Sequence, residues 1–162
     1  MFTPAFKQQV IERLLLELNN SLQSAELAAK SAHDLATHEQ SKPETQYDTV
    51  GLEAAFLAEG QSQRVTQLQK EIADWQQLIS CPSTNDIQSG SLIELTDETF
   101  STRYFLLGRT SGGMTLTLAP LKVTVISHQS PMGKALLGKQ IDDDVSLTVS
   151  EKTHVYEVSN IV

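Results

Sequence analysis

The sequence contains one cysteine, Cys81, among 162 residues, and this scarcity excludes two kinds of structure. A single cysteine cannot form an internal disulfide, and it cannot supply the paired thiolates of a cysteine-based metal site. Its neighbours Ser80 and Pro82 indicate a linker position rather than a catalytic thiol. The four histidines show no i, i+4 pair of the kind that binds a metal ion on a helix, so we assign them no site.

Two further shortages concern charge and hydrophobic length. Basic residues are outnumbered by acidic ones and the formal net charge is −8, so the chain has no general affinity for the nucleic-acid backbone. No apolar run approaches the ~20 residues that a membrane span needs, and the first residues lack a charged-then-apolar signal pattern. We therefore expect a cytoplasmic protein that makes no contact with a membrane.

The first half of the chain has the apolar pattern of two helices folded back on each other. From Ile11 to Ala36, apolar residues recur in alternating steps of four and three, which is the spacing of a coiled-coil seam. The same spacing returns from Ala54 to Ile79, and the polar segment 38–46 between the two runs contains Pro43. We predict an antiparallel α-hairpin over residues 1–80, with its tip at about 38–46 and arms of about 45 Å. Alanines dominate the half near the tip, and Leu14 widens the apolar stripe at the base, where we expect additional packing.

The second half of the chain changes to a period of two after a breaker cluster at residues 80–85. Alternating apolar residues in 114–118, 123–125 and 145–149 predict short strands, and Ser111–Gly113 predicts a turn. We therefore assign residues 86–162 to a second domain, which we expect to be a small antiparallel sheet. The overall fold class is α+β.

One short helix is expected to interrupt this sheet. Ser130 is a good N-cap, Pro131 suits the first turn, and Gly138 suits the position after the last turn. Leu136 and Leu137 would pack on the sheet. A hydroxyl in this capping position is better explained by helix initiation than by nucleophilic catalysis.

The segment Ser130-Pro-Met-Gly-Lys-Ala-Leu-Leu-Gly-Lys139, followed by the acidic turn Asp142–Asp144, resembles the C-terminal signature of the bacterial GreA/GreB transcript-cleavage factors. The resemblance implies an antiparallel coiled coil followed by an FKBP-like domain. It also implies that RNA polymerase is the partner, bound through its secondary channel, and that nucleic acid is met only within the transcription complex. The residues that would help to dock the polymerase are Ser130, Pro131, Met132, Gly133, Lys134 and Leu136. The acidic turn itself is expected to be solvated rather than to bind a metal ion, since three adjacent carboxylates cannot all face one ion.

In that family, acidic residues at the hairpin tip help to hold a magnesium ion in the polymerase active site, so that the polymerase cleaves its own RNA. The factor itself is not an enzyme and needs no cofactor of its own. Aligned on Tyr47, the family's aspartate falls on Gln40 and its glutamate on Pro43, so neither carboxylate is in register. The tip candidates in this chain are Glu39, Glu44 and Asp48, of which Glu39 and Glu44 are the candidate magnesium ligands within the polymerase complex. This shift leaves open whether the tip stimulates cleavage or competes with factors that do.

Two alternatives belong to other classes of protein. An FKBP-like fold would also suit a peptidyl-prolyl isomerase or chaperone, which needs an aromatic-lined cavity. The aromatic residues available for such a cavity are Phe100, Tyr104, Phe105 and Tyr156. A coiled-coil adaptor is the other alternative, because Leu14 and Leu16 would permit the hairpin to pack against a second copy. The tip acids Glu39 and Glu44 also have a simple explanation as solvated loop residues.

Overall fold

The computed structural model describes residues 2–37, 49–149 and 152–162. It divides the chain into two compact units, one formed by residues up to Leu15 together with Asp74–Val162, the other by Leu16–Ala73. The boundary between residues 1–80 and 86–162 stays a prediction about which parts of the chain fold independently. Within the described residues, no helix is both long and apolar enough to cross a membrane.

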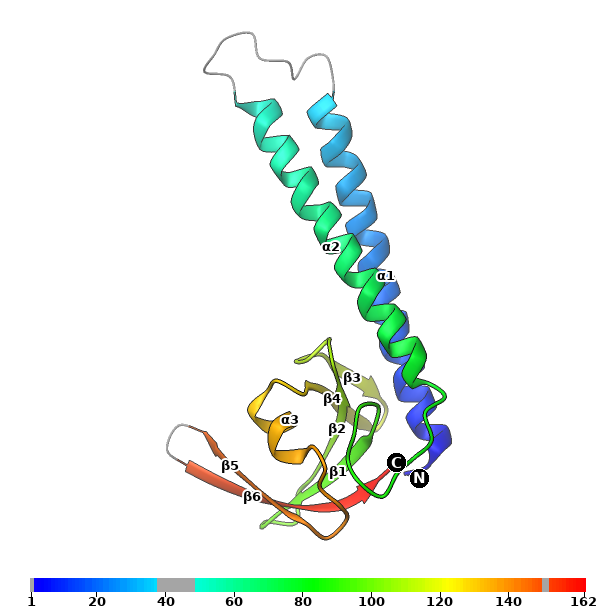
Figure 1. Ribbon diagram of the computed structural model, residues 1–162, viewed down its shortest axis with the longest axis vertical. Helices are drawn as coiled ribbons and strands as arrows, with labels where there is room; N and C mark the ends of the chain where they lie inside the picture. The colour runs from blue at the N-terminus through cyan, green and yellow to red at the C-terminus, as the bar shows by residue number, and fades with distance from the viewer. Residues whose placement is uncertain (1, 38–48, 150–151) are drawn as a thin grey trace. The chain divides into compact units, whose positions relative to one another are not determined.

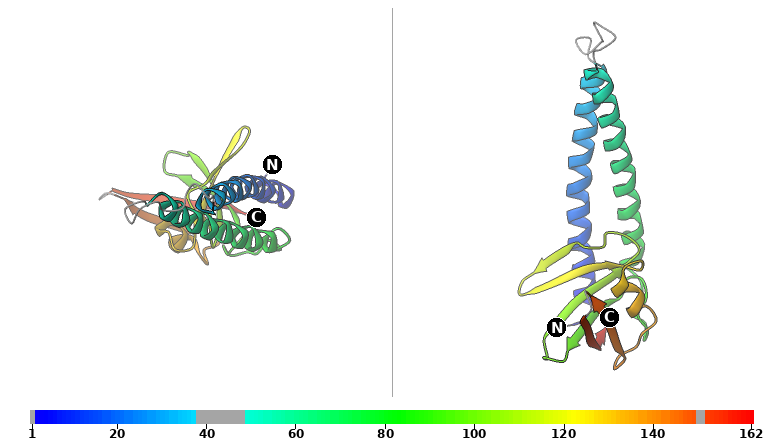
Figure 2. Two further views of the ribbon diagram at one scale, coloured as in Figure 1. Left: turned by 90° about the horizontal axis from the view of Figure 1, so that it is seen from above. Right: turned by 90° about the vertical axis from the view of Figure 1, so that its left-hand side faces the viewer.

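Two long helices form the α-hairpin that the apolar spacing predicts. Helix α1 spans Pro4–Thr37 and helix α2 spans Val50–Leu78, and the two run side by side in all views (Figures 1 and 2). In the Leu16–Ala73 unit, the buried apolar side chains fall on the predicted seam, with two leucines and an isoleucine toward one end and alanines toward the other. They are Leu18, Ala25, Ala32, Ala54, Leu68 and Ile72. The hairpin prediction is confirmed, while its predicted tip lies outside the described residues.

The other unit contains a six-stranded sheet in the order β3-β4-β2-β1-β6-β5. Its strands are β1 (Leu92–Asp97), β2 (Thr102–Gly108), β3 (Thr115–Leu118), β4 (Leu121–Ser127), β5 (Asp144–Val149) and β6 (Lys152–Ile161). Four neighbouring pairs are antiparallel, but β2 and β4 are parallel. The expectation of a purely antiparallel sheet is therefore corrected to a mixed one.

The parallel pair follows from the path of the chain after β2. After β2, the segment 109–114 leads to β3, which does not pair with β2 but forms the edge of the sheet, one strand further out. Strand β4 then returns between β3 and β2, antiparallel to β3 and consequently parallel to β2. The predicted turn at Ser111–Gly113 lies in this crossover, where Ser111 and Gly113 both have positive φ. The local turn was predictable, but a hairpin and a crossover can begin with the same turn residues.

The main core lies on the face of the sheet that carries helix α3 (Pro131–Leu136), as Figure 1 shows. Its buried apolar residues come from five strands, α3 and the segment before β1. They are Ile87, Ile93, Leu95, Phe105, Leu107, Ile126, Leu136, Val145, Tyr156, Val158 and Ile161. An α-hairpin followed by a sheet with one short helix is the fold that the sequence predicts, and this prediction is confirmed.

The base of the hairpin belongs to the same unit as the sheet and packs on it. The Phe2 ring lies 5.9 Å from the Tyr104 ring of β2, and the Trp75 Nε1–H donates to the Ser111 Oγ at 3.2 Å. A Cβ added to Gly108 would lie 2.2 Å from the Trp75 ring, so only glycine leaves room for the indole. Leu14 is fully buried. The widened apolar stripe at the base is thus explained by packing beyond the seam.

Candidate functional site

Helix α3 begins as the sequence predicts, at a serine cap. The Ser130 Oγ accepts a hydrogen bond from the backbone N–H of Gly133 at 3.0 Å, and its own O–H donates to the Ser127 carbonyl at 2.8 Å. Pro131 occupies the first turn, where its missing N–H costs no hydrogen bond. Ser130 therefore fixes where α3 starts, and its hydroxyl is engaged in doing so.

Gly133 allows α3 to lie directly against the end of β4. A Cβ at this position would lie 2.0 Å from the Ser127 carbonyl oxygen and 2.8 Å from its carbon. Both are backbone atoms, which cannot move aside as a flexible side chain could. The glycine in this part of the motif is required by the close approach of two backbone segments.

The remaining residues of the motif divide between the core and the surface. Leu136 is fully buried in the core and Met132 packs partly against it, whereas Pro131 and Lys134 are exposed. Leu137 is also exposed, at 49%, contrary to the expectation that it packs on the sheet. Pro131, Lys134 and Leu137, three residues apart in sequence, form what we call the α3 surface. Of the six predicted docking residues, four thus build the helix or pack on the core, namely Ser130, Met132, Gly133 and Leu136. The other two, Pro131 and Lys134, are exposed and can contact a partner.

The acidic segment after α3 forms a tight turn. The Asp143 carboxylate accepts from the backbone N–H of Gln140 at 2.8 Å, and Asp142 has a φ of 71°. Asp142 and Asp144 are exposed. Within residues 2–37, 49–149 and 152–162, no three His, Cys, Asp or Glu residues are placed to hold a metal ion.

A serine–histidine contact that the sequence did not suggest lies just before α3. The Ser89 Oγ and the His128 Nε2 are 2.8 Å apart, and the backbone N–H of His128 donates to the Gly108 carbonyl at 3.0 Å. Burial, with a smaller contribution from the Arg109 charge, lowers the pKa of His128 and favours a neutral ring. The pair joins the loop before β1 to the loop before α3. No sequence spacing could reveal it, because 39 positions separate the two residues.

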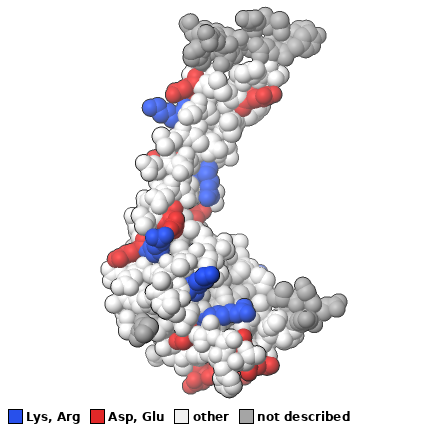
Figure 3. Space-filling model, turned by 180° about the vertical axis from the view of Figure 1, so that it is seen from behind, with Lys and Arg blue, Asp and Glu red and all other residues white. Residues whose placement is uncertain are grey.

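The tip candidates Glu39, Glu44 and Asp48 lie outside the described residues. On the face drawn in Figure 3, acidic and basic side chains are mixed along the hairpin and do not gather into a large patch of either sign. Such a surface shows no extended basic track for nucleic acid on that face.

Three of the four aromatic residues considered for an isomerase cavity border two different hollows. Phe100 is 88% exposed and borders a small hollow with Thr96, Asp144 and other residues. Tyr104 and Phe105 border a different hollow, together with two cationic side chains. These two hollows therefore give no support to one aromatic-lined pocket built from Phe100, Tyr104 and Phe105.

Comparison with known proteins identifies the family. Residues 82–162 match the family described as "Transcription elongation factor, GreA/GreB, C-term", and this match covers half of the chain. The chain therefore belongs to the GreA/GreB family of transcription elongation factors. Transcription elongation factor GreA of Sphingopyxis alaskensis is 32% identical over 80 residues, which are 49% of this chain and 46% of that protein. The matched segment thus spans about half the length of this curated relative.

Three solved structures are similar over most of the chain but at low sequence identity. GreA factor homolog 1 (Gfh1) of Thermus thermophilus is 21% identical, with 91% of this chain and 94% of that chain covered and a TM-score of 0.39. Gfh1 of Thermus aquaticus is 25% identical, with coverages of 93% and 90% and a TM-score of 0.38. The GreA/GreB factor of Nitrosomonas europaea is 13% identical, with coverages of 83% and 92% and a TM-score of 0.38.

Proposed function

We propose that this protein is a transcription elongation regulator that binds RNA polymerase at its secondary channel and directs the tip of its α-hairpin toward the active centre. The observation that carries the proposal is the family match over residues 82–162, which includes the whole of α3 and the turn after it. A GreA/GreB factor acts with RNA polymerase, and this chain has the hairpin that such a role requires.

The length of the hairpin supports this role. Helices of 34 and 29 residues extend about 50 and 43 Å at ~1.5 Å per residue, far beyond what is needed to cover one face of a small sheet. In the half of the hairpin that lies farther from Leu68 and Trp75, the buried residues between the two helices are mainly alanines. Small seam residues permit closely spaced helices, which suits insertion into a narrow channel.

The α3 surface is the proposed docking element. Pro131, Lys134 and Leu137 offer an apolar and cationic contact on a helix held rigidly by the Ser130 cap and the close approach of Gly133 to Ser127. A rigid surface loses little conformational entropy on binding. Because only the exposed members can touch a partner, substitutions there should weaken polymerase binding without unfolding the protein.

At the tip, the sequence favours competition over stimulation of RNA cleavage. Gln40 and Pro43 stand where the family has its aspartate and glutamate, so the tip lacks carboxylates at both positions. Glu39 and Glu44, each one residue away, are the groups that could still act on a magnesium ion held by the polymerase. The protein has no catalytic role of its own in either case.

The test is RNA cleavage in a purified, backtracked RNA polymerase complex, with this protein alone and in the presence of a cleavage-stimulating GreA. We expect no shortening of the RNA with this protein alone and suppression of GreA-stimulated cleavage as its concentration rises. Shortened RNA would show that Glu39 and Glu44 function, and the double variant Glu39→Ala, Glu44→Ala should then abolish the effect. If neither activity changes, the proposed binding to the polymerase is wrong.

A matched pair of charge reversals separates docking from general electrostatics. Lys134→Glu alters the α3 surface, whereas Lys70→Glu makes the same change at an exposed position on α2. We expect Lys134→Glu to raise the concentration needed for half-maximal suppression at least tenfold. Equal effects of the two variants would contradict docking through the α3 surface.

A further inference from the structure

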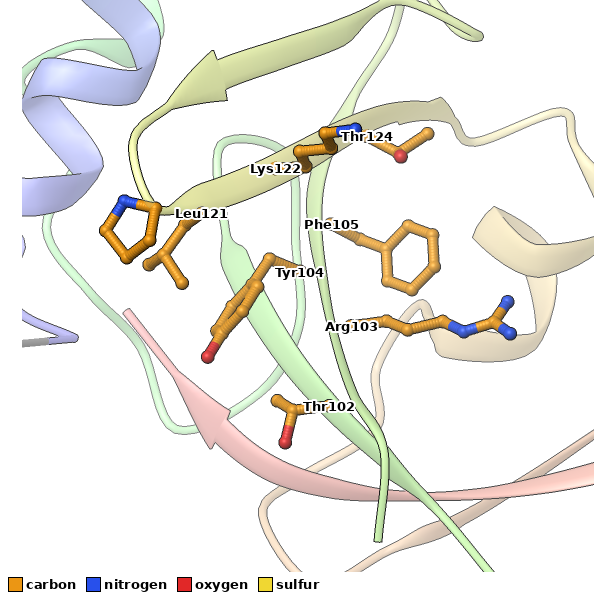
Figure 4. A pocket seen from close by; sticks show the side chains of 8 residues that line it. Thr102, Arg103, Tyr104, Phe105, Leu121, Lys122 and Thr124 are labelled. Atoms are coloured by element: carbon orange, nitrogen blue, oxygen red, sulfur yellow. The ribbon is translucent and has the colours of Figure 1, made fainter. Parts of the chain in front are cut away.

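The short helix α3 leaves one end of its face of the sheet uncovered, and a hollow lies there. It has a volume of about 510 Å³ and opens where β2 and β4 begin (Figure 4). Its lining residues come from these two strands and the turn before β4. They are Thr102, Arg103, Tyr104, Phe105, Pro120, Leu121, Lys122 and Thr124.

Two cationic side chains lie on neighbouring strands at this hollow. Tyr104 pairs with Val123 in the parallel register of β2 and β4, so the preceding residues, Arg103 and Lys122, fall on the same face beside each other. Phe105 and Thr124 form the next pair on that face. Figure 4 shows the Phe105 ring between the two cationic side chains, which extend in different directions from it. Neighbouring positions of like charge do not stabilise a sheet, so strand pairing alone does not explain this placement.

The chain compensates only one of the two charges. The Arg103 guanidinium lies 5.9 Å from the centre of the Tyr156 ring. The pKa of Asp97 is lowered chiefly by the hydrogen bond from the Thr99 hydroxyl, and the Arg103 charge makes a small further contribution. Lys122 is exposed, and the described residues offer it no hydrogen bond or ion pair. None of the eight lining residues is acidic, although the chain as a whole carries a net charge of −8.

The hydrogen-bonding groups at the hollow define the ligand. Lysine and arginine side chains only donate hydrogen bonds, and the hydroxyls of Thr102 and Thr124 can add further donors. This set fits a group with several acceptor oxygens and negative charge, and arginine and lysine together are well suited to phosphate. A volume of about 510 Å³ is that of a pocket for a small molecule. The strong negative net charge of the chain disfavours a nucleic-acid polymer.

We propose that this hollow binds the phosphate groups of a small molecule of nucleotide size, with Lys122 and Arg103 as the cationic contacts and Thr124 as a hydroxyl donor. The site is separate from the α3 surface and does not depend on the proposed function. It would give the protein a means of responding to a soluble phosphorylated metabolite.

The experiment is a titration of the ¹⁵N-labelled full chain with pyrophosphate, with ATP and with a single-stranded RNA dodecamer, followed by amide chemical shifts. We expect pyrophosphate and ATP to cause saturable shifts centred on residues 102–105 and 121–124. Lys122→Gln should weaken ATP binding at least tenfold, because a charge-assisted hydrogen bond contributes a factor of roughly 10 to 100. Lys70→Gln, the same substitution at an exposed position on α2, should leave the affinity unchanged.

Several results would overturn the proposal. They are the absence of saturable shifts up to about 10 mM ligand, shifts centred outside the two segments, and equal weakening by Lys70→Gln and Lys122→Gln. RNA binding without ATP or pyrophosphate binding would contradict the small-molecule assignment. Lys122 is exposed and therefore contributes little to folding, and Arg103→Lys, which retains the charge, provides a second variant that should bind within a fewfold of the unaltered protein.

Discussion

Replacement of Gly133 by alanine tests the close approach of α3 to β4. The added Cβ would lie 2.0 Å from the Ser127 carbonyl oxygen, and real Cβ atoms are essentially never found within 3.0 Å of such an atom. The two segments must therefore separate by about 1 Å. That displacement strains two hydrogen bonds of the Ser130 hydroxyl, which are 2.8 and 3.0 Å long.

The size of the effect follows from these contacts. Overpacking of this kind costs about 1–3 kcal/mol, and each weakened hydrogen bond costs about 1 kcal/mol. The better helix propensity of alanine returns about 1 kcal/mol. We expect Gly133→Ala to lower the free energy of unfolding by about 3 kcal/mol, measured by urea denaturation. Trp75 is the single tryptophan and belongs to the same unit as α3, so its fluorescence reports on the relevant transition.

Two other glycines provide controls for this measurement. Gly60 lies within α2 and an added Cβ meets nothing within 4 Å, so Gly60→Ala should raise stability by about 0.5–1 kcal/mol, followed by circular dichroism. Gly138 also has open space but a φ of +79°, so Gly138→Ala isolates the cost of that conformation, about 1 kcal/mol. If Gly133→Ala changes stability by less than Gly138→Ala, the steric argument is refuted.

Three further predictions concern the same unit. Gly108→Ala should displace the Trp75 ring, because the new Cβ would lie 2.2 Å from it, and the tryptophan emission should shift to longer wavelength. Ser130→Ala should lower the free energy of unfolding by about 1 kcal/mol through loss of the helix cap, whereas Ser130→Thr should retain most of it; equal losses in a urea titration would contradict the capping role. The pKa of His128 is lowered in the folded state, so the unfolded chain binds more protons below pH 6.5, and stability should decline as the pH falls through that value. His128→Gln should flatten this part of a stability–pH profile, and an unchanged slope would show that other groups cause it.

The sequence alone determined the elements whose signals are local. The period of the apolar residues predicts α1 and α2, because burial along one stripe requires a fixed spacing. Ser130, Pro131 and Gly138 predict the limits of α3, because helix ends are set by neighbouring residues. The family resemblance rests on the same short segment, and the match over residues 82–162 confirms it. The FKBP-like character of the sheet and the roles of Glu39 and Glu44 stay predictions.

Only the tertiary structure decided which distant residues meet. Strand β4 returns beside β2 in parallel, and no local pattern distinguishes that path from a hairpin. The same pairing places Lys122 and Arg103 at neighbouring positions of the sheet. The sequence could not predict this proximity, because 19 positions separate the two residues. Tertiary contacts also give different roles to neighbouring residues of α3. Gly133 allows the helix to lie against the backbone of Ser127, whereas Lys134 is exposed to solvent. Sequence spacing specifies what each element can be, whereas burial and charge at a site depend on which elements the fold brings together.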